Sequence, residues 1–278
     1  STLPFVAPFA PDLAFIKNTS SSSDWFWADR QRLDRSIRSN SSNSEQSGTA
    51  YNVQFRGAFS SSWTNYIGYL LKRAPGFFDL VSFKGNSSST QNVSHNLKTV
   101  PEMMILKSRS GGFDWNVYHA SLGNNKALVL NDTSVPGSST TNAWNNTTPT
   151  ASVFSVGDNA YTNQGNQDVV AFLFASLNGI SKVGSYNGSS SSVNVDCGFT
   201  NGARFVMIKR TDSTGNWVVF DTVRGINSGN DPYLQFNTND QQNNSYDAID
   251  TLASGFTVNS GNGNYNTHGG TYIFLAIA

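Results

Sequence analysis

The chain has 278 residues, of which 13% are charged, and 18 basic residues balance 18 acidic ones to give a formal net charge of zero. This balance provides no electrostatic attraction for nucleic acid or for an anionic membrane surface, so neither is an expected partner. The longest apolar run, residues 272–278, is far shorter than the roughly 20 residues of a membrane-spanning helix, and no membrane insertion is expected. A single cysteine, Cys197, excludes an intrachain disulfide and is expected in the core.

Residues 1–75 form the first of three similar units. Apolar residues 13–17 and 25–29 flank a Ser-rich turn and predict a β-hairpin, and the apolar run 66–70 predicts a terminal strand. The unit lacks the opening strand that the later units have. Either it is degenerate, or its opening strand lies upstream of Ser1.

A basic stretch, residues 30–38, follows the first hairpin. Asp34 interrupts it and no aromatic residue is interleaved with the arginines, as a nucleic-acid patch would require. The stretch is therefore expected to be a solvated loop.

Residues 76–178 form the second unit, and Pro75-Gly76 marks its start. An opening strand and an alternating polar and apolar strand precede the hairpin, and shorter strands follow it. The predicted strands are 78–83, 91–97, 103–107, 115–119, 127–130, 152–156 and 169–173.

Residues 179–278 form the third unit and repeat this order after Asn178-Gly179. The predicted strands are 180–186, 193–197, 205–208, 217–220, 233–236, 255–258 and 272–276. About seven short strands in a hundred residues predict an all-β fold of three tandem β-sandwich-like modules with antiparallel sheets, the first of them incomplete.

Two spacings support the repeat. Each hairpin has a lysine and a tryptophan eight residues apart, and the terminal strands recur every 103 residues. The repeated residues are Lys17, Lys107 and Lys209 with Trp25, Trp115 and Trp217. Because large aromatic side chains dominate core energetics, the three tryptophans are interpreted as structural anchors of their units.

Several strands, notably 205–208 and 272–278, are apolar on both faces. A strand that is open to water on one face should alternate, so these strands must be covered on both sides. A second sheet supplies one cover, and a loop, a neighbouring module or another chain supplies the other. The last possibility favours a homo-oligomer, with a trimer preferred.

No catalytic constellation can be assembled from the sequence. His95, His119 and His268 lie far apart and none has a partner at the spacing of a metal site. His119 takes the place of Asp29 and Asp221, four residues after the repeated tryptophan, and is expected to bond to a nearby loop. We therefore expect no enzyme activity, no metal site and no cofactor.

Recognition is expected where the copies differ. Trp144 stands in a loop rich in Asn and Thr, and an exposed aromatic beside the amides of Asn145 and Asn146 suits stacking on a neutral sugar. Tyr246 closes a similar polar segment, residues 237–246. These four residues are candidate glycan contacts, with Trp144 predicted to be exposed and Trp217 buried.

Several segments resemble a known repeated module. They are residues 11–18, 66–76, 93–97, 101–107, 180–188 and 221–225. Together they are similar to the repeat of tailed-bacteriophage structural proteins, especially tail-fibre and other tail proteins of marine phages, including those of cyanobacteria. The resemblance covers nearly the whole chain and implies a virion component without catalytic residues.

The sequence thus predicts a non-enzymatic virion structural protein, a tail fibre or tail appendage that contributes to host-surface attachment. Its expected partners are other tail proteins, further copies of itself and a host-surface glycan. Its expected location is the phage tail, after assembly in the host cytoplasm. The alternatives are a capsid decoration protein and a stand-alone carbohydrate-binding β-sandwich protein.

Overall fold

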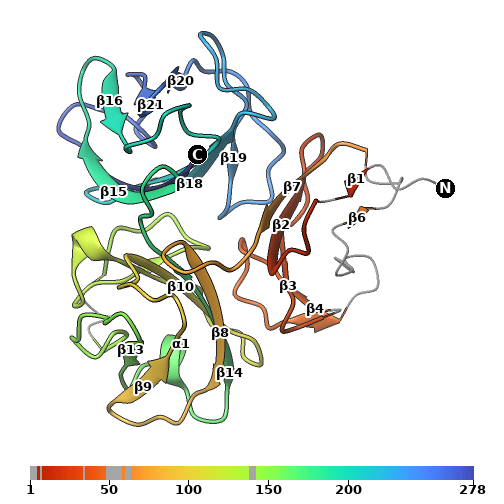
Figure 1. The fold of residues 1–278 in the computed structure, drawn as a ribbon, viewed down its shortest axis with the longest axis vertical. Coiled ribbons are helices and arrows are strands. Elements are labelled where there is room, and N and C mark those ends of the chain that lie inside the picture. Colours follow the sequence, from red (N-terminus) through yellow and green to blue (C-terminus); the bar gives the residue numbers. More distant parts are fainter. Residues whose placement is uncertain (1–4, 7, 34, 48–57, 60–63, 138–141) are drawn as a thin grey trace.

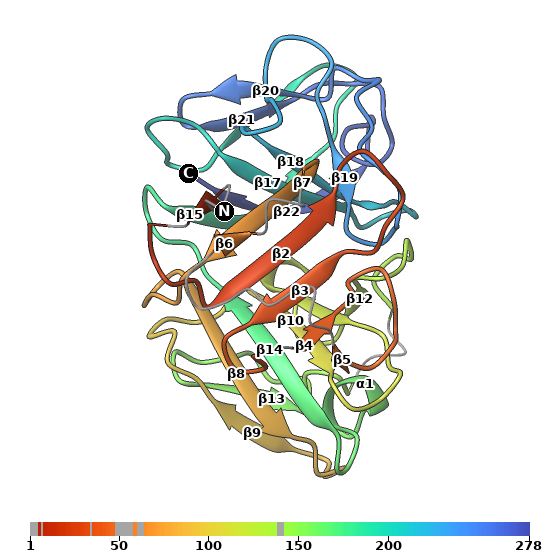
Figure 2. The same cartoon turned by 90° about the vertical axis from the view of Figure 1, so that its right-hand side faces the viewer.

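The computed structural model describes residues 5–6, 8–33, 35–47, 58–59, 64–137 and 142–278. Strands account for 41% of it and helices for 3%, and the sheets are antiparallel. The predicted all-β, sandwich-like class is therefore confirmed. Figure 1 shows three groups of strands placed around a common centre, and Figure 2 shows the first group face-on.

The first sheet has five strands in the order β5-β4-β3-β2-β7, and a separate short pair joins β1 to β6. The strands are β1 Phe5–Val6, β2 Leu13–Asn18, β3 Phe26–Asp29, β4 Arg35–Ile37, β5 Gln46–Ser47, β6 Ala58–Phe59 and β7 Tyr66–Leu71. The predicted hairpin is β2 with β3, and the predicted terminal strand is β7.

The second sheet has the order β12-β11-β10-β14-β8, and β13 pairs with β9 in an outer layer. The strands are β8 Phe78–Lys84, β9 Gln91–Ser94, β10 Met103–Ser108, β11 Asn116–His119, β12 Leu128–Val129, β13 Val153–Val156 and β14 Asp168–Phe174. Two single turns of helix complete it, the 3-10 turn η2 (Ala120–Leu122) and α1 (Ala160–Asn163).

The third sheet has the order β15-β22-β17-β18-β19, with an outer layer β16-β21-β20. The strands are β15 Ser181–Asn187, β16 Val193–Asp196, β17 Phe205–Arg210, β18 Trp217–Asp221, β19 Leu234–Gln235, β20 Ile249–Leu252, β21 Gly255–Val258 and β22 Thr271–Ile277. Apart from the additional β20, its layout repeats that of the second sheet.

The edge strands β8 and β15 are followed by glycines that no other residue could replace without a shift of the chain. A Cβ at Gly85 would lie 2.2 Å from the main-chain oxygen of Gln164, and one at Gly188 would lie 2.2 Å from that of Thr267. The repeated glycine therefore lets the end of the edge strand lie against the loop that precedes the terminal strand.

One hydrophobic core is shared by all three sheets. It includes Leu13 and Phe15 from β2, Met103 and Ile105 from β10, and Phe205 and Met207 from β17, with Trp25, Trp27, Trp115 and Trp217. At its centre the rings of Trp27 and Trp115 lie 5.0 Å apart, and Phe172 and Phe236 contact Trp27. Residues from three distant parts of the chain thus bury their apolar surface together.

The shared core explains the strands that are apolar on both faces. Successive side chains of a strand point to opposite faces, so Met207 of β17 points into the shared core while Val206 and Ile208 point into the layer below β16 and β21. Strand β10 divides its residues in the same way. Both covers are present within one chain, so these strands no longer argue for an oligomer. The homotrimer stays a prediction without that support.

Candidate functional site

The three repeated tryptophans bind the units to one another. Each indole is buried, and each Nε1–H donates to a main-chain oxygen of another unit. The bonds run from Trp25 to Gln235 (2.7 Å), from Trp115 to Arg38 (2.9 Å) and from Trp217 to Val129 (2.9 Å). The first unit thus contacts the third, the third contacts the second, and the second contacts the first, which closes a ring. The predicted burial of Trp217 is confirmed.

The three repeated lysines make the same ring of contacts. Each ammonium is fully buried and donates to carbonyl oxygens of its own hairpin and of a neighbouring unit. Lys17 bonds to Ser23 and Asn239, Lys107 to Ser108, Phe113 and Ser42, and Lys209 to Gly215 and Thr133, over 2.6–3.0 Å. Burial lowers the pKa of each lysine to about 8, and nearby aspartates oppose this effect. All three remain charged at pH 7.

An asparagine in each unit completes this arrangement. Its Oδ1 accepts from the main-chain N–H of the repeated tryptophan, and its Nδ2 donates to the side chain that precedes that tryptophan. The sets are Asn40 with Trp25 and Asp24, Asn131 with Trp115 and Asp114, and Asn237 with Trp217 and Asn216. We missed these asparagines in the sequence because their spacing from the tryptophan varies and the chain is rich in Asn.

Four residues after each repeated tryptophan the units diverge. Asp29 forms a buried ion pair with Arg32, and Asp221 forms one with Arg224. In the second unit His119 replaces the carboxylate, and its Nδ1 accepts from the main-chain N–H of Ser121 at 3.2 Å. His119 thus caps the 3-10 turn η2 that directly follows it, and the expected bond to a nearby loop stays a prediction.

His119 should make the protein sensitive to acid. Burial lowers the pKa of His119 to about 4, below its ordinary value of 6.5, despite an opposing effect from the main chain of Phe274. The unfolded chain therefore binds a proton between pH 6.5 and pH 4 that the folded chain does not, and stability falls as the pH falls through this range. Between pH 6.5 and pH 4, His119 is expected to lower the free energy of unfolding by about 3 kcal/mol.

Chemical denaturation at pH 7 and pH 4 measures this loss. His119→Asn is the matched variant, because Asn Oδ1 can accept from Ser121 as Nδ1 does but cannot titrate. The variant should lose about 3 kcal/mol less than the parent over this interval. An equal loss in both proteins would show that His119 is not the group responsible.

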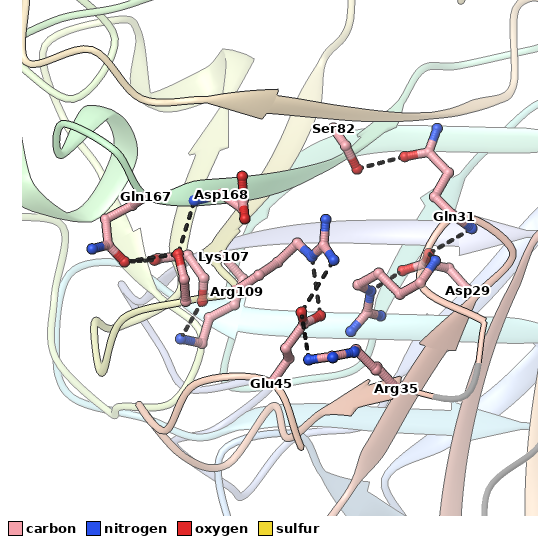
Figure 3. A network of polar contacts seen from close by, with 12 residues as sticks. Asp29, Gln31, Arg35, Glu45, Ser82, Lys107, Arg109, Gln167 and Asp168 are labelled. Atoms are coloured by element: carbon pink, nitrogen blue, oxygen red, sulfur yellow. Dashed lines mark hydrogen bonds and ion pairs between the residues drawn. The ribbon is translucent and has the colours of Figure 1, made fainter. Parts of the chain in front are cut away.

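The basic stretch 30–38 is not a simple solvated loop, so that prediction is wrong. Residues 35–37 form β4, and the four arginines each pair with a carboxylate. The pairs are Arg30–Asp12, Arg32–Asp29, Arg35–Glu45 and Arg38–Asp24. Glu45 also bonds to Arg109 of the second unit at 3.0 and 3.1 Å, as Figure 3 shows. Within the stretch, Gln31 donates to Leu80 and Arg38 accepts from Trp115, so the stretch helps to join the first two units.

The four candidate glycan contacts do not form one site. Trp144 is 0% exposed, donates its indole N–H to the oxygen of Lys126 at 3.0 Å and packs edge-on against Tyr118. Its predicted exposure is wrong, because its loop folds over the outer core of the second unit. Asn145 is half-buried and Asn146 is exposed in a left-handed turn. Tyr246, 46% exposed, belongs to the third unit.

Other predictions about single residues can be compared with the structure directly. Cys197 is buried, as expected, and burial raises the pKa of its thiol to about 12. Parts of the segment 237–246 serve as contacts between units, since Asn239 and Gln242 bond to the first hairpin.

Among the described residues no group of three His, Cys, Asp or Glu side chains is placed to hold a metal ion. Within the same residues no helix is long and apolar enough to cross a membrane.

A groove beside β7 is the candidate binding site. It has a volume of about 200 Å³ and lies between the first sheet and the end of the third. One wall is residues 67–71 of β7, and the other includes Asp221, Thr222 and Val223. Phe205 and Ile277 also line the groove. The hydroxyl of Tyr69 donates to Asp221 at 2.7 Å and joins the walls. Val223 is 74% exposed and lines the groove.

A family described as Domain of unknown function (DUF7483) matches residues 71–278, which is well over half of the chain. The chain belongs to the DUF7483 family. The matched region begins at the last residue of β7 and contains the whole of the second and third sheets, while the rest of the first sheet precedes it. Neither a curated protein nor a solved structure matches the chain. The family description carries no functional information.

Proposed function

We propose that this DUF7483 protein is a non-enzymatic structural component of a bacteriophage virion, in a tail fibre or another tail appendage. The observation that carries the proposal is where the side chains of the six repeated lysines and tryptophans form their hydrogen bonds. All six bond to main-chain oxygens of a neighbouring unit instead of lining an open cleft. A scaffold needs such a closed ring of contacts, and the resemblance to phage tail repeats adds support.

The proposal extends to attachment at the host surface. Asn146 and Tyr246 remain exposed in polar loops with little charge, which suits a neutral glycan. A site of this kind binds weakly, with a millimolar affinity near −4 kcal/mol, and holds a cell only when several copies act together. The protein would therefore work beside other tail proteins and as a homo-oligomer, with a trimer preferred.

Imaging of intact particles tests the location. Gold-labelled antibodies against the chain should decorate the tail of purified phage, and the tail fraction of disrupted particles should contain the protein. Labelling of the head alone would favour a capsid decoration protein instead. Absence from the particle would contradict the proposed function.

A further inference from the structure

In the described part of the chain, the first sheet has no counterpart of the edge strands β8 and β15, and β7 forms its edge. Strands β14 and β22 each lie between two neighbours, with β8 and β15 on their outer sides, whereas β7 pairs with β2 alone among the described residues. The side chains of β7 are also less buried than those of β14 and β22. No residue of β7 is buried, while six of the seven residues of β14 and five of the seven of β22 are. Among the described residues, no strand pairs with β7 on the side where β8 and β15 pair with its counterparts.

The main chain of β7 is oriented to pair on that side. Thr19 N–H donates to the oxygen of Asn65, and the register pairs Lys17 with Ile67. Thr19 and Asn65 are therefore a hydrogen-bonded pair, and in an antiparallel ladder such pairs alternate with pairs that do not exchange hydrogen bonds. It follows that Ile67 bonds to β2, whereas Gly68 and Leu70 direct their N–H and C=O groups away from β2. In the second sheet the counterparts of these two residues pair with β8. At Gly68 and Leu70, the side of β7 that faces away from β2 thus has the hydrogen-bonding geometry of an internal strand.

The groove lies where the missing strand would run. In the second unit, the edge strand β8 meets the turn that follows β3. There Gln31 donates to the main-chain oxygen of Leu80 at 3.2 Å. It also accepts from the hydroxyl of Ser82 at 2.6 Å, as Figure 3 shows. In the third unit, β15 meets η2, which follows β11. Val223 takes the place of Gln31 in the turn after β18, because each is the second residue after the repeated aspartate, and it lines the groove.

We propose that the groove accepts an antiparallel β-strand beside β7, and that polypeptide joined directly to the amino end of Ser1 supplies it. The lengths of the connections between the edge strand and the outer strand in the second and third units predict where along the chain the new strand lies. Six residues link β8 to the outer strand β9, and five link β15 to β16. The outer strand of the first unit, β1, begins at Phe5, so a link of five or six residues leaves one or two residues between the end of the new strand and Ser1.

The chemistry of the strand follows from its counterparts. It is extended and about seven residues long, like β8 and β15, with apolar side chains at alternate positions that enter the shared core. In β8 these side chains are Phe78 and Leu80. The strand would cover the apolar edge formed by Ile67, Tyr69 and Leu71. This inference is independent of the proposed function, since a complete first sheet would serve any role of the protein.

A copy of residues 76–85 fused before Ser1 tests whether the groove accepts a strand. Hydrogen exchange at the amides of Gly68 and Leu70 should slow about tenfold relative to the parent chain, because both amides gain partners. The matched control carries the same extension with the copies of Phe78 and Leu80 changed to Asp, and it should show no slowing. Equal exchange in the parent and both extended chains would overturn the proposal.

Two substitutions in the extended chain locate the strand. Gly68→Pro removes an N–H that does not face β2, so it should leave the first sheet intact but abolish the slowing at Leu70. Val223→Asp changes the opposite wall, far from β2, and should also abolish the slowing. Slow exchange that persists in both variants would show that the extension does not lie in the groove.

Cross-linking in the full-length gene product identifies the natural occupant. A photoreactive phenylalanine in place of Val223 should capture residues that directly precede Ser1 of the same chain, as identified by mass spectrometry. Capture of a second copy, of another protein, or of residues 48–57 would overturn the assignment of the occupant. Failure of this experiment would leave the location of the protein in the phage tail untouched.

Discussion

Replacing Trp217 by alanine is expected to lower the free energy of unfolding by about 3–5 kcal/mol, as truncation of a fully buried tryptophan does. The indole is 1% exposed, fills the shared core and donates to Val129 of the second unit. Chemical denaturation at pH 7 measures the effect. Trp144→Ala should have a similar effect, because this ring is also fully buried.

Two controls separate packing from the hydrogen bond at Trp217. Trp217→Phe keeps an aromatic ring but leaves the oxygen of Val129 without its donor, and should cost about 1–3 kcal/mol. Tyr246→Ala, at an exposed aromatic, should change stability by less than about 1 kcal/mol. If Trp217→Ala were as stable as the parent, the indole would not be an anchor.

Replacing Lys107 by methionine is expected to lower the free energy of unfolding by about 3 kcal/mol. The ammonium donates to main-chain oxygens of Ser42, Ser108 and Phe113. Its removal leaves one buried and two partly buried oxygens without this donor. The cost of burying the charge, seen in its lowered pKa, offsets part of the loss.

Lys126→Met is the matched control for Lys107, because Lys126 is exposed and should tolerate the change within about 0.5 kcal/mol. The same denaturation measurement applies to both variants. If the two lysines behaved alike, the desolvation of Lys107 would cancel its hydrogen bonds, and the lysines would not hold the units together.

Local patterns in the sequence predicted much of the fold. The hairpins around the three Lys–Trp pairs form at the expected residues, as do the terminal strands. These elements are predictable because a turn between two apolar β-rich runs is a local signal. The first unit has no counterpart of β8 and β15 among its described residues, and the sequence indicated this as a gap in the repeat.

Long-range contacts could not be predicted from the same patterns. Trp144 stands among Asn and Thr residues, and local polarity does not show that Tyr118 and Lys126 cover its ring. Nor does an apolar strand reveal which element will cover its second face. The shared core joins residues more than two hundred positions apart, such as Phe15 and Phe236, whose rings are 5.8 Å apart.

Differential scanning calorimetry of the intact chain tests most directly whether the three sheets form one unit closed by the Trp and Lys contacts. We predict a single transition whose calorimetric enthalpy equals its van't Hoff enthalpy, because a sheet that left the shared core would expose the apolar surface of the other two. Trp25→Phe, which removes one of the three indole bonds, should shift this whole transition to lower temperature. Separate transitions, or a shift in Trp25→Phe confined to the first sheet, would contradict a shared core.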